Sequence, residues 1–117
     1  MFSYEKLEVY KKAFQTNQKE YRLLKRNRTI VPYAKNQLGR ASLSIMLNIA
    51  EGSAKFNNKD RMNFYVTARA SAFECASILR FLYDEGEIES GLKKNLYFSY
   101  EEISRMLFTT IKNLKSE

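Results

Sequence analysis

Apolar side chains recur at spacings of three and four residues along four stretches of this chain, and no other feature constrains the fold as strongly. Such spacing places the side chains of each stretch on one face of an α-helix. It predicts helices over about residues 4–26, 32–53, 58–85 and 90–115. The predicted inner faces contain Leu7, Tyr10, Phe14, Asn17, Tyr21 and Leu24; Leu38, Ala41, Ser42, Ile45, Asn48, Ile49 and Gly52; Tyr65, Ala68, Ala72, Cys75, Leu79 and Leu82; and Leu96, Tyr100, Ile103, Leu107 and Leu114.

Residues with terminal preferences mark the ends of these helices. Pro32 suits the first turn of a helix, and Asn57 and Asn58 are a favourable N-cap pair for the third helix. Gly52 is predicted to cap the second helix in the left-handed conformation, which glycine adopts without strain. Gly86 ends the third pattern, and Ser90 is predicted to cap the fourth helix.

The breaks between the predicted helices are short, about six residues each. No segment shows the sustained alternation that predicts a strand, and short connections make consecutive helices antiparallel neighbours. A chain of 117 residues is about the size of one domain. The predicted fold is therefore all-α, an antiparallel up-down-up-down four-helix bundle that forms a single domain over residues 1–117.

Several residue types that carry enzyme chemistry are missing. The sequence has no histidine, which excludes Ser-His and Cys-His nucleophiles, and one cysteine cannot build a Cys/His zinc site. The glycines are scattered singly, so none opens a phosphate-binding loop. Cys75 lies on a predicted apolar face and is interpreted as a buried thiol. We expect a protein that is not an enzyme and that holds no metal or cofactor.

The single cysteine and the charged N-terminal segment also bear on location. Cys75 cannot form an internal disulfide, and Lys and Glu interrupt the first 25 residues where a signal peptide would be apolar. No apolar run approaches the roughly 18 residues of a membrane-spanning helix. These features predict a cytoplasmic protein without a membrane partner.

The formal net charge is +7, and the excess lies in the first half of the chain. Such a bias favours anionic partners, nucleic acid first, although solvated helix ends carry similar charges. Without a known base-reading motif, binding would be directed to the phosphate backbone or to shape. The candidate contacts are Arg22, Lys25, Arg26, Arg28, Lys35, Arg40, Lys55, Lys59 and Arg61.

Ser44, Asn48 and Glu51 lie four and three residues apart, so they point the same way from the second helix. We interpret them as a polar network with a neighbouring helix or subunit, in which Asn48 and Glu51 are largely buried. Glu51 and Glu74 would pair there with Arg40, Arg69 or Asn48. The alternative is a catalytic or magnesium-binding pair of Glu51 and Glu74, with Asp60 near the loop.

Two segments of the last helix carry more apolar surface than one inner face can use. They are residues 96–100 and 106–108, in which neighbouring apolar side chains point about 100° apart. Some of these side chains must face outward or into a second protein. This excess predicts self-association.

Three segments resemble one known family. They are QLGRASLSIMLNIAEG (residues 37–52), ARASAFE (68–74) and EEISRMLFTTIKNLK (101–115). They are similar to the four-helix bundle proteins related to the 23S rRNA intervening-sequence protein. This superfamily includes the accessory variability determinant protein of diversity-generating retroelements. The resemblance spans nearly the whole chain.

Eight residues match the family motifs: Arg40, Ser44, Asn48, Glu51 and Gly52 in the second helix, and Arg69, Ser71 and Glu74 in the third. Three positions depart from them. Gly39 stands where the family often has a second arginine, Met46 where proline is common, and Ala70 where glycine is common. The missing arginine lowers the positive charge of the second helix, and the missing proline predicts a straighter one.

The resemblance implies an antiparallel four-helix bundle that assembles as a ring-like homopentamer, with no established enzymatic activity. Some family members are encoded inside ribosomal RNA genes. The retroelement relatives bind nucleic acid and a reverse transcriptase through the basic surface of the pentamer. For this chain the resemblance implies a homopentamer, with RNA or DNA and a reverse transcriptase as candidate partners.

Three functional hypotheses follow from the sequence. The leading one is a homopentameric bundle that binds RNA or DNA through its basic surface as an accessory factor. The second is a structural or protein-interaction scaffold without nucleic-acid binding. The third and weakest is a metal-dependent nuclease that uses Glu51, Asp60 and Glu74.

Overall fold

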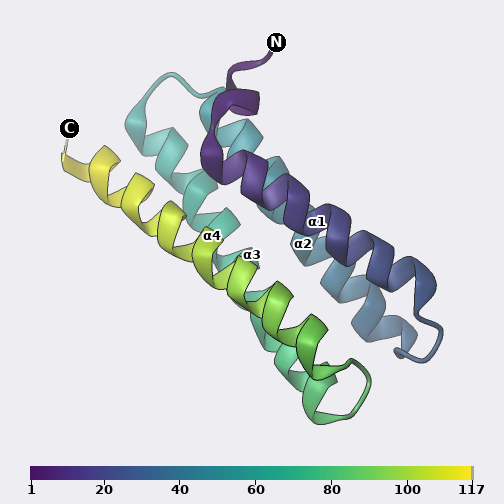
Figure 1. Cartoon of the computed structure of the whole chain (residues 1–117). Helices are drawn as coiled ribbons and strands as arrows, with labels where there is room; N and C mark the ends of the chain where they lie inside the picture. Colours follow the sequence, from purple (N-terminus) through teal and green to yellow (C-terminus); the bar gives the residue numbers. More distant parts are fainter. Residues whose placement is uncertain (117) are drawn as a thin grey trace.

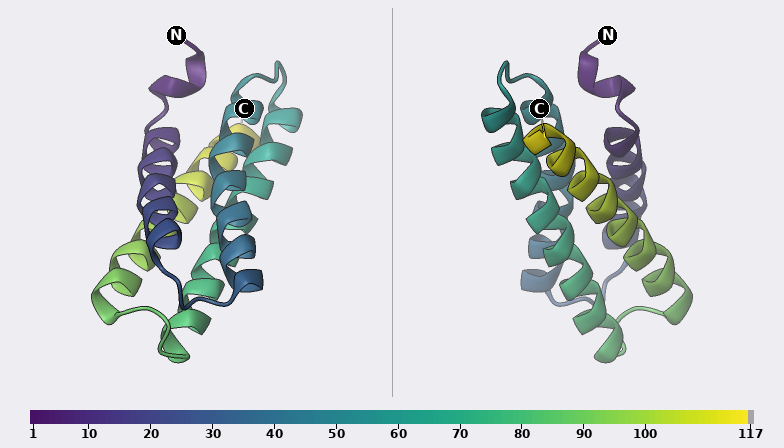
Figure 2. Two further views of the ribbon diagram at one scale, coloured as in Figure 1. Left: turned by 90° about the vertical axis from the view of Figure 1, so that its right-hand side faces the viewer. Right: turned by 90° about the vertical axis from the view of Figure 1, so that its left-hand side faces the viewer.

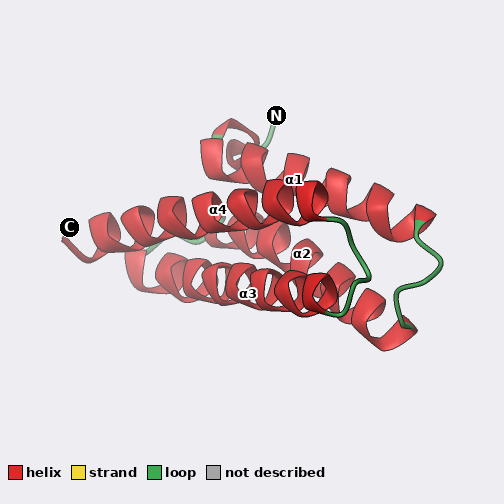
Figure 3. Ribbon diagram, turned by 60° about the horizontal axis from the view of Figure 1, so that its bottom comes forward, coloured by secondary structure: helices red, strands yellow, loops and turns green. Residues whose placement is uncertain are grey.

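The computed structural model describes residues 1–116 and contains four α-helices after a short 3-10 turn. The turn is Ser3–Lys6, and the helices are α1 (Glu8–Arg26), α2 (Pro32–Ser53), α3 (Asn58–Asp84) and α4 (Ser90–Ser116). The described residues contain helices and loops without any strand (Figure 3). The long axis of the molecule is 46 Å.

Successive helices run in opposite directions and form a bundle (Figures 1 and 2). Each helix packs against two neighbours, in the order α1, α2, α3, α4 and back to α1. The packing of α3 against α2 and α4 is more extensive than the packing of α1 against its neighbours. The predicted all-α four-helix bundle is therefore confirmed. No helix within residues 1–116 is both long and apolar enough to cross a membrane.

Two helix ends follow from local side-chain and backbone chemistry. The Asn57 side chain accepts a hydrogen bond of 2.9 Å from the backbone N–H of Asp60, as predicted for the N-cap of α3. Gly86 adopts a φ of 75° just after α3, and the Glu87 N–H donates to the Leu82 carbonyl at 2.8 Å. This left-handed glycine closes the helix and turns the chain toward α4.

Gly52 is not the left-handed cap predicted from the sequence. It is buried within α2, and Gly86 is the one described glycine with a positive φ. A Cβ atom at position 52 would lie 2.7 Å from a ring carbon of Tyr65 on α3. The glycine is needed because the Tyr65 ring lies directly against the α2 backbone.

The core lies along the inner faces of α2, α3 and α4. Leu38, Ile49, Leu79, Ile103 and Leu107 have no solvent-exposed surface. Each fully buried side chain of this kind contributes about 1.5–3 kcal/mol relative to an exposed one. The predicted inner faces of these three helices are largely confirmed.

The inner face of α1 differs from the prediction. Phe14 and Tyr21 were expected in the core, but they are 41% and 60% exposed. The buried residues of α1 are Val9, Ala13, Thr16, Glu20 and Leu24. These positions have the same spacing of three and four, so a second face with smaller and polar side chains competes with the aromatic one. The face with smaller side chains packs into the core, and the rings of Phe14 and Tyr21 remain on the surface.

Candidate nucleic-acid interface

Four cations gather where α1 ends. Arg22, Lys25 and Arg26 lie on the last two turns of α1, and Arg28 follows in the loop. All four are exposed, and together with Tyr21 they line a shallow concavity of about 580 Å³. Among the described residues, none of the four has a carboxylate within 4.0 Å. We call Arg22, Lys25, Arg26 and Arg28 the basic end.

The loop that carries Arg28 is held by Asn27. The Asn27 side-chain oxygen accepts hydrogen bonds from the backbone N–H groups of Thr29 and Ile30, at 2.8 and 2.9 Å. The Lys35 ammonium donates to the Asn27 carbonyl at 2.7 Å. Lys35 therefore provides a hydrogen-bond donor for a backbone carbonyl at the C-terminal end of α1. It is half-buried beside the basic end. The fixed loop keeps Arg28 next to the last turn of α1.

The remaining candidate cations lie elsewhere. Lys55, Lys59 and Arg61 are at the α2–α3 connection, which is at the opposite end of the bundle (Figure 1). The Arg61 Nε donates to the Lys55 carbonyl at 2.7 Å, and the Lys55 ammonium lies 5.0 Å from the Phe64 ring centroid. Lys59 is exposed there, and Arg40 is exposed midway along α2. The nine candidates thus form two separate groups and one isolated arginine.

Carboxylates border one side of the basic end. The α3–α4 connection carries Glu85, Glu87 and Glu89 at the same end of the molecule (Figure 2). The Asn27 side-chain amide donates to the Glu87 carbonyl at 3.5 Å, which joins the two connections. An anionic partner is therefore attracted to the α1 side of this end and repelled from the α3–α4 side.

The predicted polar network is only partly present. The Asn48 amide donates to the Ser44 carbonyl at 2.8 Å and to the Ser44 hydroxyl at 3.0 Å, and the Ser71 hydroxyl lies 3.1 Å from that of Ser44. Glu74 instead accepts a hydrogen bond from Gln37. The network joins α2 to α3 through two serines.

Glu51 does not join this network within the single chain, and its burial against a neighbouring subunit stays a prediction. Glu51 and Arg40 are exposed, and neither has a side-chain hydrogen bond or ion pair among residues 1–116. Asn48 is half-buried and bonds within its own helix instead of reaching α3. Glu51 lies on the same face of α2 as Ser44 but about two turns further along, where it forms no ion pair with any side chain of residues 1–116.

Arg69 lies away from the network, on the α4 side of α3. Its guanidinium is 4.8 Å from the Phe73 ring centroid and 5.4 Å from that of Phe108. The Nε atom is buried and has no hydrogen-bond partner in the described part of the chain. Contact with two aromatic rings replaces the predicted ion pair with a glutamate.

Sequence reasoning missed a polar cluster inside the bundle. Glu20 of α1 is 1% exposed, and its Oε1 atom has no hydrogen-bond partner among the described residues. Burial raises the pKa of Glu20 from 4.5 to about 7, and a hydrogen bond with Ser42 partly offsets this shift. The Tyr100 hydroxyl donates to the Ser42 oxygen at 3.0 Å. The signal that could have revealed Glu20 is its spacing of four from Thr16 and Leu24.

Cys75 of α3 completes this interior cluster. Its thiol is fully buried, as predicted, and burial together with the charge of Glu20 raises its pKa. Burial also raises the pKa of the Tyr100 hydroxyl well above 10.0. Both groups are therefore protonated at neutral pH, and neither can act as a nucleophile there.

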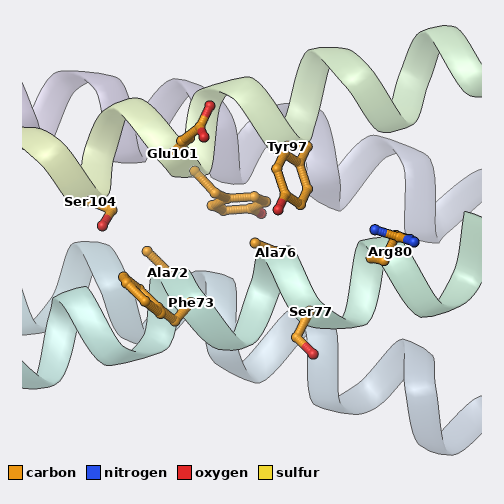
Figure 4. Close-up of a pocket in the computed structure, with 9 residues that line it drawn as sticks. Ala72, Phe73, Ala76, Ser77, Arg80, Tyr97, Glu101 and Ser104 are labelled. Atoms are coloured by element: carbon orange, nitrogen blue, oxygen red, sulfur yellow. The ribbon is translucent and has the colours of Figure 1, made fainter.

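An apolar groove of about 400 Å³ lies between α3 and α4 (Figure 4). The methyl groups of Ala72 and Ala76 face it from α3, and Tyr97 reaches into it from α4 (Figure 4). Arg80 and Glu101 stand at its edges but are engaged by Asp84 at 3.0 Å and Arg105 at 3.9 Å on their own helices. The groove offers contact surface for apolar side chains.

The carboxylates of the nuclease hypothesis do not come together. Glu51 and Asp60 are exposed, and Asp60 accepts a hydrogen bond from the Asn57 amide at 3.0 Å. Within residues 1–116 there is no group of three or more His, Cys, Asp or Glu side chains that could hold a metal ion. The structure gives no basis for a metal site built from these residues.

The fold and its basic end define a small helical-bundle protein with an exposed cationic surface that has no carboxylate partner among residues 1–116. The model of the 23S rRNA-intervening sequence protein family matches residues 5–109, and the chain belongs to this family. The family resemblance noted in the sequence is thereby confirmed. A comparison with curated proteins found no match.

A solved structure has the same fold. It is a protein with unknown function from the S23 ribosomal protein family of Bacteroides thetaiotaomicron VPI-5482. The two chains are 24% identical, with a TM-score of 0.85 and coverage of 89% of this chain and 98% of the other. At this identity the likeness concerns the fold alone. Neither the family nor this neighbour is named for an enzymatic reaction.

Proposed function

We propose that this protein is a non-enzymatic, cytoplasmic accessory factor that binds RNA or DNA through its basic end. The observation that carries the proposal is the group of four exposed cations around one concavity, without a carboxylate partner among the described residues. Free cations on a fixed helix end are available to replace the counterions of a phosphate backbone. The family name, which refers to 23S rRNA, supports a nucleic acid as the partner.

Assembly as a homopentamer would strengthen this interaction. The family resemblance implies a ring of five copies, and a ring would repeat the +7 charge of each subunit around one axis. Exposed aromatic side chains outside the basic end support self-association, since Phe73, Phe81, Phe98 and Phe108 are each about half exposed. The apolar groove between α3 and α4 adds to this surface.

A charge-neutralising variant tests the location of the interface. Replacing Arg22, Lys25, Arg26 and Arg28 together by Gln should lower affinity for a mixed-sequence RNA. The salt slope, which is the slope of the logarithm of the binding constant against the logarithm of salt concentration, should become shallower by roughly one unit per lost phosphate contact. The oligomeric state and the melting temperature should change little, because exposed charges contribute little to stability. Fluorescence anisotropy at several salt concentrations measures the first effect, and sedimentation measures the second.

A matched control removes the same charge from the other end of the bundle. Lys6, Lys59, Lys112 and Lys115 are all exposed. Their simultaneous change to Gln should leave most of the RNA affinity in place. Equal losses in the two quadruple variants would show that net charge, and not the basic end, determines binding.

The second candidate is a scaffold without nucleic-acid binding, and the exposed phenylalanines are the observation that favours it. It predicts a stable oligomer whose behaviour is the same with and without RNA. A reverse transcriptase is the protein partner that the resemblance suggests, and co-purification of the two proteins at moderate salt tests it. Capture that survives neutralisation of the basic end would favour the scaffold.

A further inference from the structure

Two exposed aromatic rings lie on the outer face of α1 beside the basic end. Phe14 and Tyr21 are seven residues apart, which is about 10.5 Å along a helix. Phe14, Tyr21 and Arg22 line one groove between α1 and α2, together with Met46. Tyr21 and Arg22 also line the concavity of the basic end. The aromatic groove and the cationic concavity are therefore continuous.

From this arrangement we infer that α1 binds single-stranded RNA or DNA in preference to duplex, with Tyr21 and Phe14 as stacking platforms for unpaired bases. The inference rests on the proposed nucleic-acid binding and specifies the form of the ligand. Aromatic side chains interleaved with cations are the usual means of holding a single strand, because every base has a flat face. In a duplex those faces are already covered by neighbouring bases.

The dimensions agree with a single strand. Successive bases of a stacked strand rise about 3.4 Å along its axis, so the helical rise from Phe14 to Tyr21 corresponds to roughly three nucleotides. The Lys25 ammonium lies 5.9 Å from the Tyr21 ring centroid. A base stacked on Tyr21 would consequently bring its own phosphate within reach of Lys25 and Arg22. Both rings lie outside the buried core of the described residues, and Phe14 contacts the partly buried Tyr10, with ring centroids 6.1 Å apart.

The test compares a mixed-sequence strand that cannot pair with itself and the duplex formed with its complement, both by fluorescence anisotropy. The wild-type protein should bind the single strand more tightly at equal salt. Tyr21→Leu should weaken single-strand binding about tenfold and leave duplex binding and the salt slope unchanged. Tyr21→Phe should retain affinity, because it keeps the ring. Phe56→Leu, which changes an exposed ring in the α2–α3 connection at the opposite end of the bundle, serves as the matched control.

Each other outcome has a definite meaning. Equal affinity for strand and duplex, or a Tyr21→Leu variant that binds the strand like wild type, would overturn the single-strand inference. The proposed function would survive that result if neutralising the basic end still abolished binding. A change of oligomeric state in Tyr21→Leu would show that a second copy covers the ring, which also overturns the inference. Binding to neither ligand would overturn both proposals.

Discussion

At the scale of single residues, the most informative side chain is one that the sequence did not single out. Glu20 lies in the interior with one carboxylate oxygen unpartnered among residues 1–116. A carboxyl group in such surroundings is favoured in its neutral form, because the charged form loses its hydration. The hydrogen bond with Ser42, whose oxygen also accepts from the Tyr100 hydroxyl, favours the ionised form but offsets only part of the effect of burial, so the protonated form of the acid stays favoured.

The burial of Glu20 predicts that the free energy of unfolding depends on pH through this residue. The pKa of Glu20 is about 7 in the folded protein, above its ordinary value of 4.5, so the folded state holds the proton more tightly than the unfolded state. The stabilisation is complete below about pH 4.5 and is lost as the pH rises through about 7, by roughly 3 kcal/mol in total. Denaturant unfolding of wild type and Glu20→Gln across this range measures the difference.

Glu20→Gln should remove this dependence and unfold at higher denaturant than wild type above about pH 8. Glu51→Gln, a change of the same kind at an exposed position, is the matched control. Two parallel pH profiles for wild type and Glu20→Gln would mean that Glu20 does not titrate with the fold.

At the scale of the elements, the sequence predicted the helices well and their interfaces less well. The ends at Pro32, Asn57 and Gly86 follow from local chemistry, so they could be read from single residues. The inner face of α1 could not, because two faces with the same spacing compete and only packing decides between them. The role of Gly52 depends on Tyr65, which comes from another helix. Local patterns do not encode such a contact.

A glycine substitution tests the packing of α2 against α3. Gly52→Ala would place a methyl group 2.7 Å from a Tyr65 ring carbon and 3.1 Å from the Phe64 Cβ. The tyrosine or the helix must move, which should cost about 1–3 kcal/mol despite the higher helix propensity of alanine. Thermal unfolding measures this loss.

Gly39→Ala is the matched control for helix propensity. Its Cβ would meet only Leu24, at an ordinary 3.6 Å, so the same substitution within the same helix should be neutral or stabilising. An equal loss of stability in both variants would contradict the account of Gly52, since it would point to a general effect on α2.

At the scale of the whole molecule, the candidate cations lie mainly at the two ends of the bundle. The basic end is formed by the C-terminus of α1, and the second group of cations lies at the opposite end of a molecule 46 Å long. The sequence could list these cations but could not show that Lys35 and Arg61 are engaged by backbone carbonyls, at 2.7 Å each. Among the described residues, the basic end is the largest group of candidate cations that is exposed and without an ion pair, and the aromatic groove lies beside it.

The proposed function depends most directly on whether RNA binding by the wild-type protein follows salt concentration. Four phosphate contacts with a single strand predict a slope of roughly −3 for the logarithm of the binding constant against the logarithm of salt concentration. Fluorescence anisotropy of a mixed-sequence single-stranded RNA, titrated with wild-type protein from low to moderate salt, provides this slope. A steep negative slope supports the account, whereas an absent signal or a slope near zero would contradict it.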